Sequence, residues 1–220
     1  MTNCLYVSEP SFSVLFPRHS IEDYVEVDDP DLPELSAFSI CAWAKFVKNG
    51  DGTILSYAVP TEDNEIAIWC YTTKVRFSLK DGWTTTYNSL LSDGFWHSIC
   101  LTWSNVDGNL TVYKDNVMTD QASGVATGKN IFGGGRWVLG QDQDSVGGGF
   151  AIKDAFQGEL AEVNVWGRVL TKQEIAWFST DCQRRMNGDV KSWPEFRTGL
   201  RREVRAVDEP SCTKCKFEVS

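Results

Sequence analysis

The sequence predicts an all-β protein whose strands form a two-sheet antiparallel jelly-roll sandwich, with one short helix near residues 171–180. Short segments that alternate apolar with polar or small residues recur along the chain, and turn residues separate them, as is typical of sandwiches. The composition suits a large apolar core, because 42% of the 220 residues are hydrophobic and 9 are Trp. A single domain of this class can be this long.

Ten segments carry the alternation expected of strands. They are residues 12–16, 24–27, 38–46, 53–57, 65–69, 75–79, 96–103, 110–113, 137–139 and 158–166. Asn49-Gly50-Asp51-Gly52 lies between the third and fourth segments and is a strong hairpin signal. We expect a loop over Pro60–Asn64 between the fourth and fifth.

The helix prediction rests on a capping pattern. Thr171 has the form of an N-cap, and Glu174 three residues later completes a capping box. Ile175, Trp177 and Phe178 supply apolar contacts. No other segment shows a convincing helical pattern.

Charge and hydropathy argue against two classes of partner. The formal net charge is −9 and no Lys/Arg stripe interleaves with aromatic residues, so we expect no nucleic-acid binding. No apolar run approaches the ~18 residues of a membrane span, so we expect no membrane insertion. The N-terminus has no basic and apolar leader pattern, which fits either a cytosolic protein or part of a larger extracellular chain.

Cysteine usage favours the extracellular alternative. The seven cysteines are Cys4, Cys41, Cys70, Cys100, Cys182, Cys212 and Cys215, and their spacing does not set their pairing. Cys70 is our expected buried free thiol, and the terminal pair 212/215 fits a tail disulfide better than zinc. Asn109-Leu110-Thr111 is a glycosylation sequon. Together these features favour an oxidising compartment.

The stretch Gly140–Phe150 is the strongest candidate for a binding loop. Asp142 and Asp144 are two residues apart after an apolar run, so in extended chain both carboxylates leave the same face. Calcium takes about 6–8 oxygen ligands in loose geometry, which suits such a loop with three following glycines. The alternative is a solvated turn with ordinary acidic residues.

Four separated motifs resemble one family. Residues 98–103 are similar to the pentraxin signature H-x-C-x-[ST]-W, although Ser98 replaces the His and His97 is one residue early. Residues 139–144 resemble the family's L-G-Q-E-Q-D loop, 63–66 its D-N-E-[IL] stretch, and 164–170 its N-x-W-x-x-[VF]-L ending. The resemblance covers roughly residues 10–195. It gives an N-terminal extension (1–9), a pentraxin domain (10–195) and a C-terminal tail with a Cys pair (196–220).

The resemblance implies a fold, a disulfide and two adjacent calcium ions. The fold is the pentraxin sandwich, which is laminin-G-like and concanavalin-like, and Cys41 is bridged to Cys100. The first ion takes oxygens from Asp63, Asn64, Asp142, the Gln143 backbone carbonyl and Asp144. Asp142 and Asp144 bridge to the second ion, which Asp154 joins. Ala151 replaces an acidic ligand of that ion, so we expect one retained and one weakened Ca2+ site.

The implied function is extracellular, calcium-dependent pattern recognition by a cyclic homo-oligomer. Trp69 falls near the aromatic position that contacts choline in some members, and Lys74 near their acid. A lysine repels a quaternary ammonium, so we expect an anionic small-molecule, glycan or protein ligand bearing phosphate or carboxylate. The alternative for Trp69 is core or interface packing.

Two rival functions would also suit an all-β sandwich. Asp63 and Glu65 share a strand face, but the third acid of the usual glucanase pattern is absent, and no catalytic Ser/His/Asp or Cys/His set stands out. We therefore expect no enzyme, and a satisfied structural role for His97. The second rival is an adhesion or oligomerisation module of a larger receptor or matrix protein, with partial or no calcium dependence.

Overall fold

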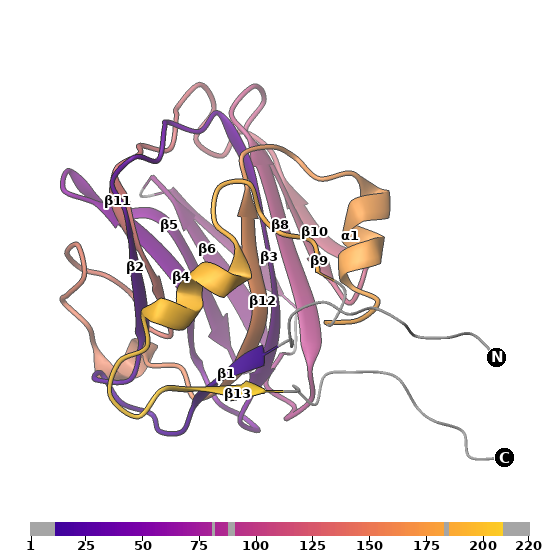
Figure 1. Cartoon of the computed structure of the whole chain (residues 1–220). Helices are drawn as coiled ribbons and strands as arrows, with labels where there is room; N and C mark the ends of the chain where they lie inside the picture. Colours follow the sequence, from indigo (N-terminus) through magenta and orange to yellow (C-terminus); the bar gives the residue numbers. More distant parts are fainter. Residues whose placement is uncertain (1–11, 81, 88–90, 183–184, 209–220) are drawn as a thin grey trace, which may run out of the picture.

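Two antiparallel sheets build the protein in this computed structural model, which describes residues 12–80, 82–87, 91–182 and 185–208. Sheet A contains, in spatial order, β10 (Val117–Ala122), β9 (Asn109–Lys114), β8 (His97–Ser104), β3 (Ala37–Phe46), β12 (Gly158–Trp166), β1 (Phe12–Phe16) and β13 (Arg205–Asp208). Sheet B contains β2 (Val25–Asp29), β11 (Gly135–Leu139), β4 (Gly52–Val59), β5 (Glu62–Tyr71), β6 (Lys74–Leu79) and β7 (Gly82–Tyr87). The sheets lie face to face (Figure 1), which confirms the predicted sandwich.

Strand alternation turns one face of each sheet toward a common core. In β5 the buried Ile66, Ile68 and Cys70 face inward, while the residues between them lie on the outer face. Aromatic rings fill the space between the sheets, with Tyr57 and Trp137 4.2 Å apart and Phe46 and Phe156 4.6 Å apart between ring centroids. The outer face of sheet B therefore remains for the loops.

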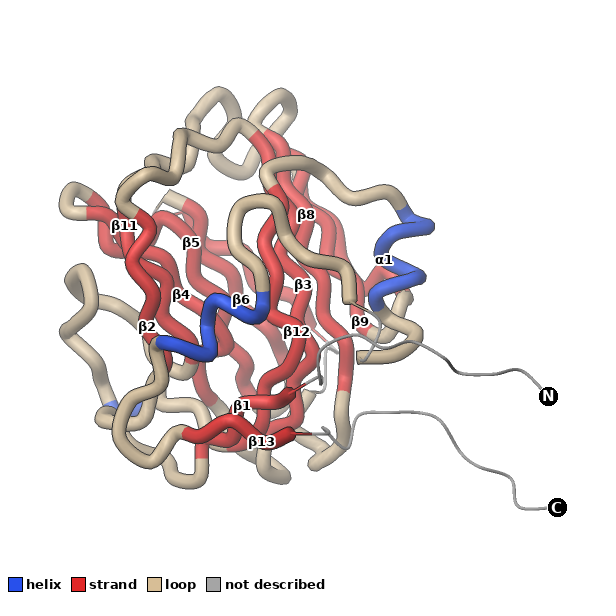
Figure 2. Tube along the Cα trace, viewed as in Figure 1, coloured by secondary structure: helices blue, strands red, loops and turns tan. Residues whose placement is uncertain are grey.

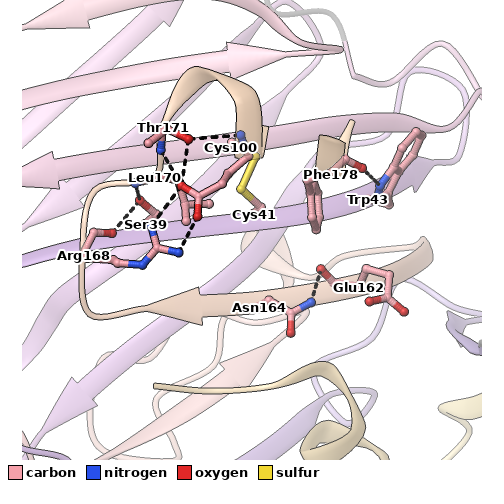
Figure 3. Close-up of a disulfide and its surroundings, with 11 residues drawn as sticks. Ser39, Cys41, Trp43, Cys100, Glu162, Asn164, Arg168, Leu170, Thr171 and Phe178 are labelled. Carbon is pink, nitrogen blue, oxygen red and sulfur yellow. Dashed lines mark hydrogen bonds and ion pairs between the residues drawn. A yellow bond between two sulfur atoms is a disulfide. The ribbon is translucent and has the colours of Figure 1, made fainter. Parts of the chain in front are cut away.

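The outer face of sheet A carries α1 (Lys172–Phe178) and the disulfide (Figures 2 and 3). Thr171 accepts a hydrogen bond from the Glu174 N–H, and the Glu174 carboxylate accepts one from the Thr171 N–H, as the capping box predicts. The Trp43 indole of β3 donates to the Phe178 carbonyl over 3.2 Å, which ties the end of α1 to the sheet. The helix prediction is confirmed.

Cys41 and Cys100 are directly opposite in the β3–β8 register, with a Cα–Cα distance of 4.1 Å, and they form the disulfide that the resemblance implies. The bridge closes a 59-residue separation. In the chain-entropy model a loop of this size is worth about 4 kcal/mol.

The Asn49–Gly52 signal marks a chain reversal but not a hairpin. β3 belongs to sheet A and β4 to sheet B, so the turn carries the chain across the sandwich. Both edges of β3 are occupied, by β8 and β12, which leaves no position for β4 beside it. The hairpin prediction is wrong for this reason.

The segment predicted as a charged tail contributes to the sandwich. A 3-10 helix, η2 (Trp193–Thr198), packs its Trp193 ring against Phe12 at 4.8 Å, and β13 pairs with β1. Strands β7 and β10 were also not expected from the sequence. Among the described residues, no helix has the length and apolar character that a membrane crossing requires.

Candidate metal centre

The loop that follows β11 is anchored on the outer face of sheet B. Ser56 of β4 and Ala67 of β5 are directly opposite each other, so small side chains leave room there. The Ser56 hydroxyl donates to the Gln141 carbonyl oxygen over 2.9 Å. The Gln143 side-chain amide donates to the Ser56 hydroxyl oxygen and to the Arg136 carbonyl. Both glutamines are buried, and their contacts fix the start of the loop.

The same loop continues through three glycines into the 3-10 helix η1 (Ile152–Asp154). Gly147 has a φ of 69°, a left-handed conformation that favours glycine, and a Cβ atom there would displace the Arg136 guanidinium, whose Nη1 atom would lie at 2.2 Å. In Figure 1 the loop and η1 lie at the left, on the opposite side of the sandwich from α1. The acidic loop and the helix thus occupy different faces.

Asp142 is a half-buried acid in surroundings that disfavour its charge. Burial raises the pKa of Asp142 most, the neighbouring Asp154 and Asp144 carboxylates raise it further, and the result is about 7. A hydrogen bond from the Trp69 side chain acts in the opposite direction. The Oδ1 atom of Asp142 is buried and has no hydrogen-bond partner within the described part of the chain. A cation beside this oxygen would relieve both the repulsion and the missing contact.

Asp154 and Asp144 complete the loop group. Burial raises the pKa of Asp154, Lys153 lowers it and Asp144 raises it. Lys153 Nζ lies 3.9 Å from the Asp154 carboxylate, so part of the local negative charge is neutralised by the protein itself. Asp144 is exposed.

Asp63 and Asn64 form a second group of donors, near the start of β5. The Asn64 amide donates to the Asp63 carboxylate over 3.0 Å, while Asn64 Oδ1 is buried without a partner among described residues. Strand alternation puts Asp63 on the same face as Glu65 and Trp69. Glu65 is anchored by Lys80 at 2.6 Å and by the Phe132 N–H at 3.0 Å.

The loop acids influence one another electrostatically. The Asp142 carboxyl is affected by the charges of Asp154 and Asp144. Across residues 12–80, 82–87, 91–182 and 185–208, no three His, Cys, Asp or Glu side chains are gathered closely enough to hold a metal ion. The donor chemistry still fits calcium, because Asp142 and Asn64 each hold an unpartnered buried oxygen. Ala151 offers no side-chain oxygen.

Trp69 and Lys74 are not cross-strand neighbours in the β5–β6 register. The Trp69 side chain is 3% exposed, so its ring face is covered, as the packing alternative predicts. Its cross-strand neighbour in β6 is Arg76, while Lys74 is opposite Tyr71. Lys74 Nζ lies 5.2 Å from the Tyr71 ring centroid.

His97 has the structural role expected of it. Its Nδ1 atom is 2.7 Å from the Asp115 carboxylate and its Nε2 atom 3.1 Å from that of Asp93. Burial alone would lower the pKa of His97, but the two carboxylates outweigh it and the pKa is raised. The imidazole therefore joins the start of β8 to the β9–β10 turn.

The predictions on the other cysteines and on the glycosylation sequon concern both described and undescribed parts of the chain. Cys70 is a buried free thiol, as predicted, and burial raises its pKa. Cys182 is disulfide-bonded, and its partner lies outside the described residues. Cys4 and the pair 212/215, for which we expect a tail disulfide, also lie outside them. Asn109 is exposed at the start of β9, so its sequon is accessible.

Comparison with solved structures identifies the class of domain first. A heptameric SAP-like pentraxin from Limulus polyphemus superposes with a TM-score of 0.82 and 25% identity, over 94% of this chain and 99% of that one. Domains LG4-5 of the mouse laminin alpha1 chain share the fold alone, with a TM-score of 0.57 and 16% identity over 77% of this chain and 46% of that one. The chain is thus a jelly-roll sandwich domain of this class.

The family follows from sequence comparison. The Pentaxin family model matches residues 13–207. Rat neuronal pentraxin-1 is 36% identical over 84% of this chain and 43% of its own length. A rat protein with sushi, von Willebrand factor type A, EGF and pentraxin domains is 34% identical over 94% of this chain and 6% of its own length. The chain belongs to the pentraxin family, and it spans less than half of these relatives.

Proposed function

We propose that this chain is a non-enzymatic, extracellular domain that binds anionic ligands in a calcium-dependent manner on the outer face of sheet B. The observation that carries the proposal is Asp142, a half-buried carboxylate beside Asp144 and Asp154 with one unpartnered oxygen. Keeping such a carboxylate ionised without a nearby cation costs folding free energy, because burial and the neighbouring carboxylates both disfavour its charge. Family membership supports the same assignment.

The donors of the first ion are Asp63, Asn64, Asp142, the Gln143 carbonyl and Asp144, and Asp154 serves the second. When bound, calcium would supply the positive charge that attracts a phosphate or carboxylate of the ligand. The protein contributes the anchored loop, because Gln141 and Gln143 are held on Ser56. Since Ala151 supplies no side-chain oxygen, the second site is the weaker one.

The disulfides support an oxidising, extracellular location, and the exposed Asn109 sequon supports glycosylation. A homo-oligomer is proposed from the heptameric Limulus relative, and light scattering after size exclusion would measure it. In such an assembly, repeated weak sites give avid binding.

Isothermal titration with calcium tests the assignment, using protein stripped with EDTA and the variant Asp142→Asn. We expect a tighter and a weaker binding event in the wild type and loss of the tighter event in the variant. Phosphate- and carboxylate-substituted agarose then tests the ligand class, with retention in calcium and release in EDTA. Retention that EDTA does not change would contradict calcium-dependent binding.

A second candidate is an adhesion or oligomerisation module with partial or no calcium dependence. Two observations favour it: within the described residues no three His, Cys, Asp or Glu side chains are gathered closely enough to hold a metal ion, and position 151 is Ala where the resemblance leads us to expect an acid. The matched relatives extend far beyond this domain, as a module of a larger protein would. A stable oligomer whose formation is insensitive to both calcium and EDTA, in protein that binds no calcium, is the result that selects this function.

A further inference from the structure

His97 joins two acidic side chains that come from different turns. Its Nε2 atom lies 3.1 Å from both carboxylate oxygens of Asp93, in the turn before β8. Its Nδ1 atom lies 2.7 Å from Oδ2 of Asp115, in the turn between β9 and β10. An ionised carboxylate only accepts hydrogen bonds, so both contacts form only if both ring nitrogens carry a proton. The arrangement therefore requires the imidazolium form of His97.

The charges around the ring favour this form in mildly acidic solution. Burial lowers the pKa of His97, but the contacts with Asp115 and Asp93 raise it. The charge of Lys114 lowers it, and the net shift is upward from 6.5. The cross-strand neighbour on β3 is Ala44, which carries no charge. The ring therefore loses one proton only as the pH rises through a folded-state pKa above 6.5.

The hydrogen-bond geometry indicates which proton is lost. A neutral imidazole keeps one N–H, and its other nitrogen can only accept. The Nδ1 contact is short and has one acceptor, whereas the Nε2 proton is shared between two oxygens at a longer distance. Asp115 is also fixed by the Ser98 N–H, which donates to its Oδ1 atom over 3.0 Å. The neutral ring therefore keeps Asp115 and directs an unprotonated Nε2 at the Asp93 carboxylate, which repels it.

Residues 93–95 form a short turn that depends on this contact. Ser92 before it is buried, and its carbonyl accepts a hydrogen bond from the loop after β3 over 2.7 Å. Within the turn, Phe95 is 71% exposed, and its N–H donates to Asp93 Oδ1 over 2.9 Å. In the described part of the chain, the Asp93 side chain has no further hydrogen bond besides that with His97. The imidazolium is thus its one hydrogen-bonded link to sheet A.

The turn also forms part of a cavity wall, because Gly94 lines a cavity of about 370 Å³ together with Lys45 and Lys48. We propose that His97 is a pH-sensitive latch: its imidazolium holds residues 93–95 against β8, and loss of the Nε2 proton frees this turn and the Gly94 wall of the cavity. The turn is held in mildly acidic solution and released as the pH rises. This device is independent of calcium, since none of its residues is a proposed ligand.

Long-range proton–nitrogen NMR of the imidazole rings tests which proton is lost. The chain has 2 His, and the variant His19→Asn assigns the signals without touching the latch, because His19 is exposed. We expect both His97 nitrogens to be protonated at pH 5.5 and only Nδ1 at pH 9. A neutral ring that is protonated at Nε2, or a ring already neutral at pH 5.5, overturns the proposal.

Hydrogen exchange of the Phe95 amide tests the release of the turn. Its protection factor, corrected for the intrinsic rate at each pH, is measured at pH 5.5 and pH 9, with folding checked by near-ultraviolet circular dichroism. We expect protection to fall about 10-fold or more in wild type and His19→Asn, as loss of a hydrogen bond between charged groups predicts. His97→Asn should show low protection at both pH values. Equal protection at both pH values in wild type overturns the latch, as does a fall that His97→Asn retains.

Discussion

Replacing Glu162 with glutamine should stabilise the protein at and above neutral pH. The Glu162 side chain is 2% exposed, and neither carboxylate oxygen has a hydrogen-bond partner among described residues. It occupies the point where the β12–β3 register shifts, with a φ of 50°. Figure 3 shows that Asn164 binds the main-chain carbonyl of Glu162 and not its carboxylate. The acid is thus buried with little compensation: burial raises its pKa most, and only the Arg185 charge and the Asn164 side chain act in the opposite direction.

The size of the effect follows from the proton affinity. Burial, opposed by the Arg185 charge, raises the pKa of Glu162 from 4.5 to about 7. At about 1.4 kcal/mol for each tenfold change in proton affinity, ionisation in the folded state costs roughly 3 kcal/mol. The cost is absent below pH 4.5, where the acid is protonated in both states. It grows as the unfolded state ionises and is complete above about pH 7.

Urea unfolding at pH 4.5 and pH 8, with disulfides intact, measures this cost. The stability difference between Glu162→Gln and wild type should be near zero at pH 4.5 and roughly 3 kcal/mol at pH 8. Glu159→Gln is the control in the same strand, because the Glu159 side chain is 19% exposed and lies 3.4 Å from Lys45. The same difference at both pH values, or a less stable Glu162→Gln at pH 8, would refute the reasoning.

Three further predictions concern other parts of the chain. The pKa of His97 is raised above 6.5 by Asp115 and Asp93, so its stabilisation is complete below pH 6.5 and lost as pH rises through the folded-state value. His97→Asn should therefore cost ~1–3 kcal/mol at pH 5.5 and less at pH 9, measured by urea unfolding; a pH-independent cost would contradict this. Asp154→Ala should weaken the second calcium about 10-fold and leave the first intact, and calorimetry showing two unchanged sites would reject that assignment. Asn109→Gln, expressed in secreting mammalian cells, should lose one glycan by mass; an unchanged mass would exclude glycosylation there.

Alternation located the strands that bury one face in the core. The predicted segment 38–46 matches β3 except for its first residue, and the predicted segment 158–166 matches β12. These two strands pair with each other in sheet A. The expectation failed for β10, whose sequence Val-Met-Thr-Asp-Gln-Ala is exposed or half-buried throughout. An edge strand of this kind is held by its backbone ladder more than by side-chain burial, so it leaves a weak pattern.

Turn chemistry specified a reversal at Asn49–Gly52 but not which strands pair beside it. That choice depends on long-range contacts: β8 and β12 already occupy both edges of β3. Glu162 shows the same limit, because a shift of register is invisible in the alternation of residues 158–166. Pairing and bulges are properties of the assembled sheet.

The sequence predicted which residues of the candidate site could donate oxygen atoms, but not how these residues pack in the folded protein. The D-x-D spacing of Asp142 and Asp144 was visible in the sequence, and so was the family resemblance of the loop. The burial of Trp69 and the docking of Gln141 and Gln143 on Ser56 were not, because both depend on long-range packing. Alternation along β5 predicts that Trp69 lies on the outer face of sheet B, but it does not predict that this side chain is buried there.

Thermal unfolding with millimolar calcium and with EDTA tests the calcium assignment most directly, in wild type and in Asp142→Asn. A ligand that binds only the folded state at about 100 times its Kd adds about 2.7 kcal/mol of stability. For a domain of this size we expect a rise in Tm of ~5–10 °C in wild type, and little or none in the variant. Identical Tm values for wild type in calcium and EDTA would contradict the account, as would an undiminished rise in Asp142→Asn.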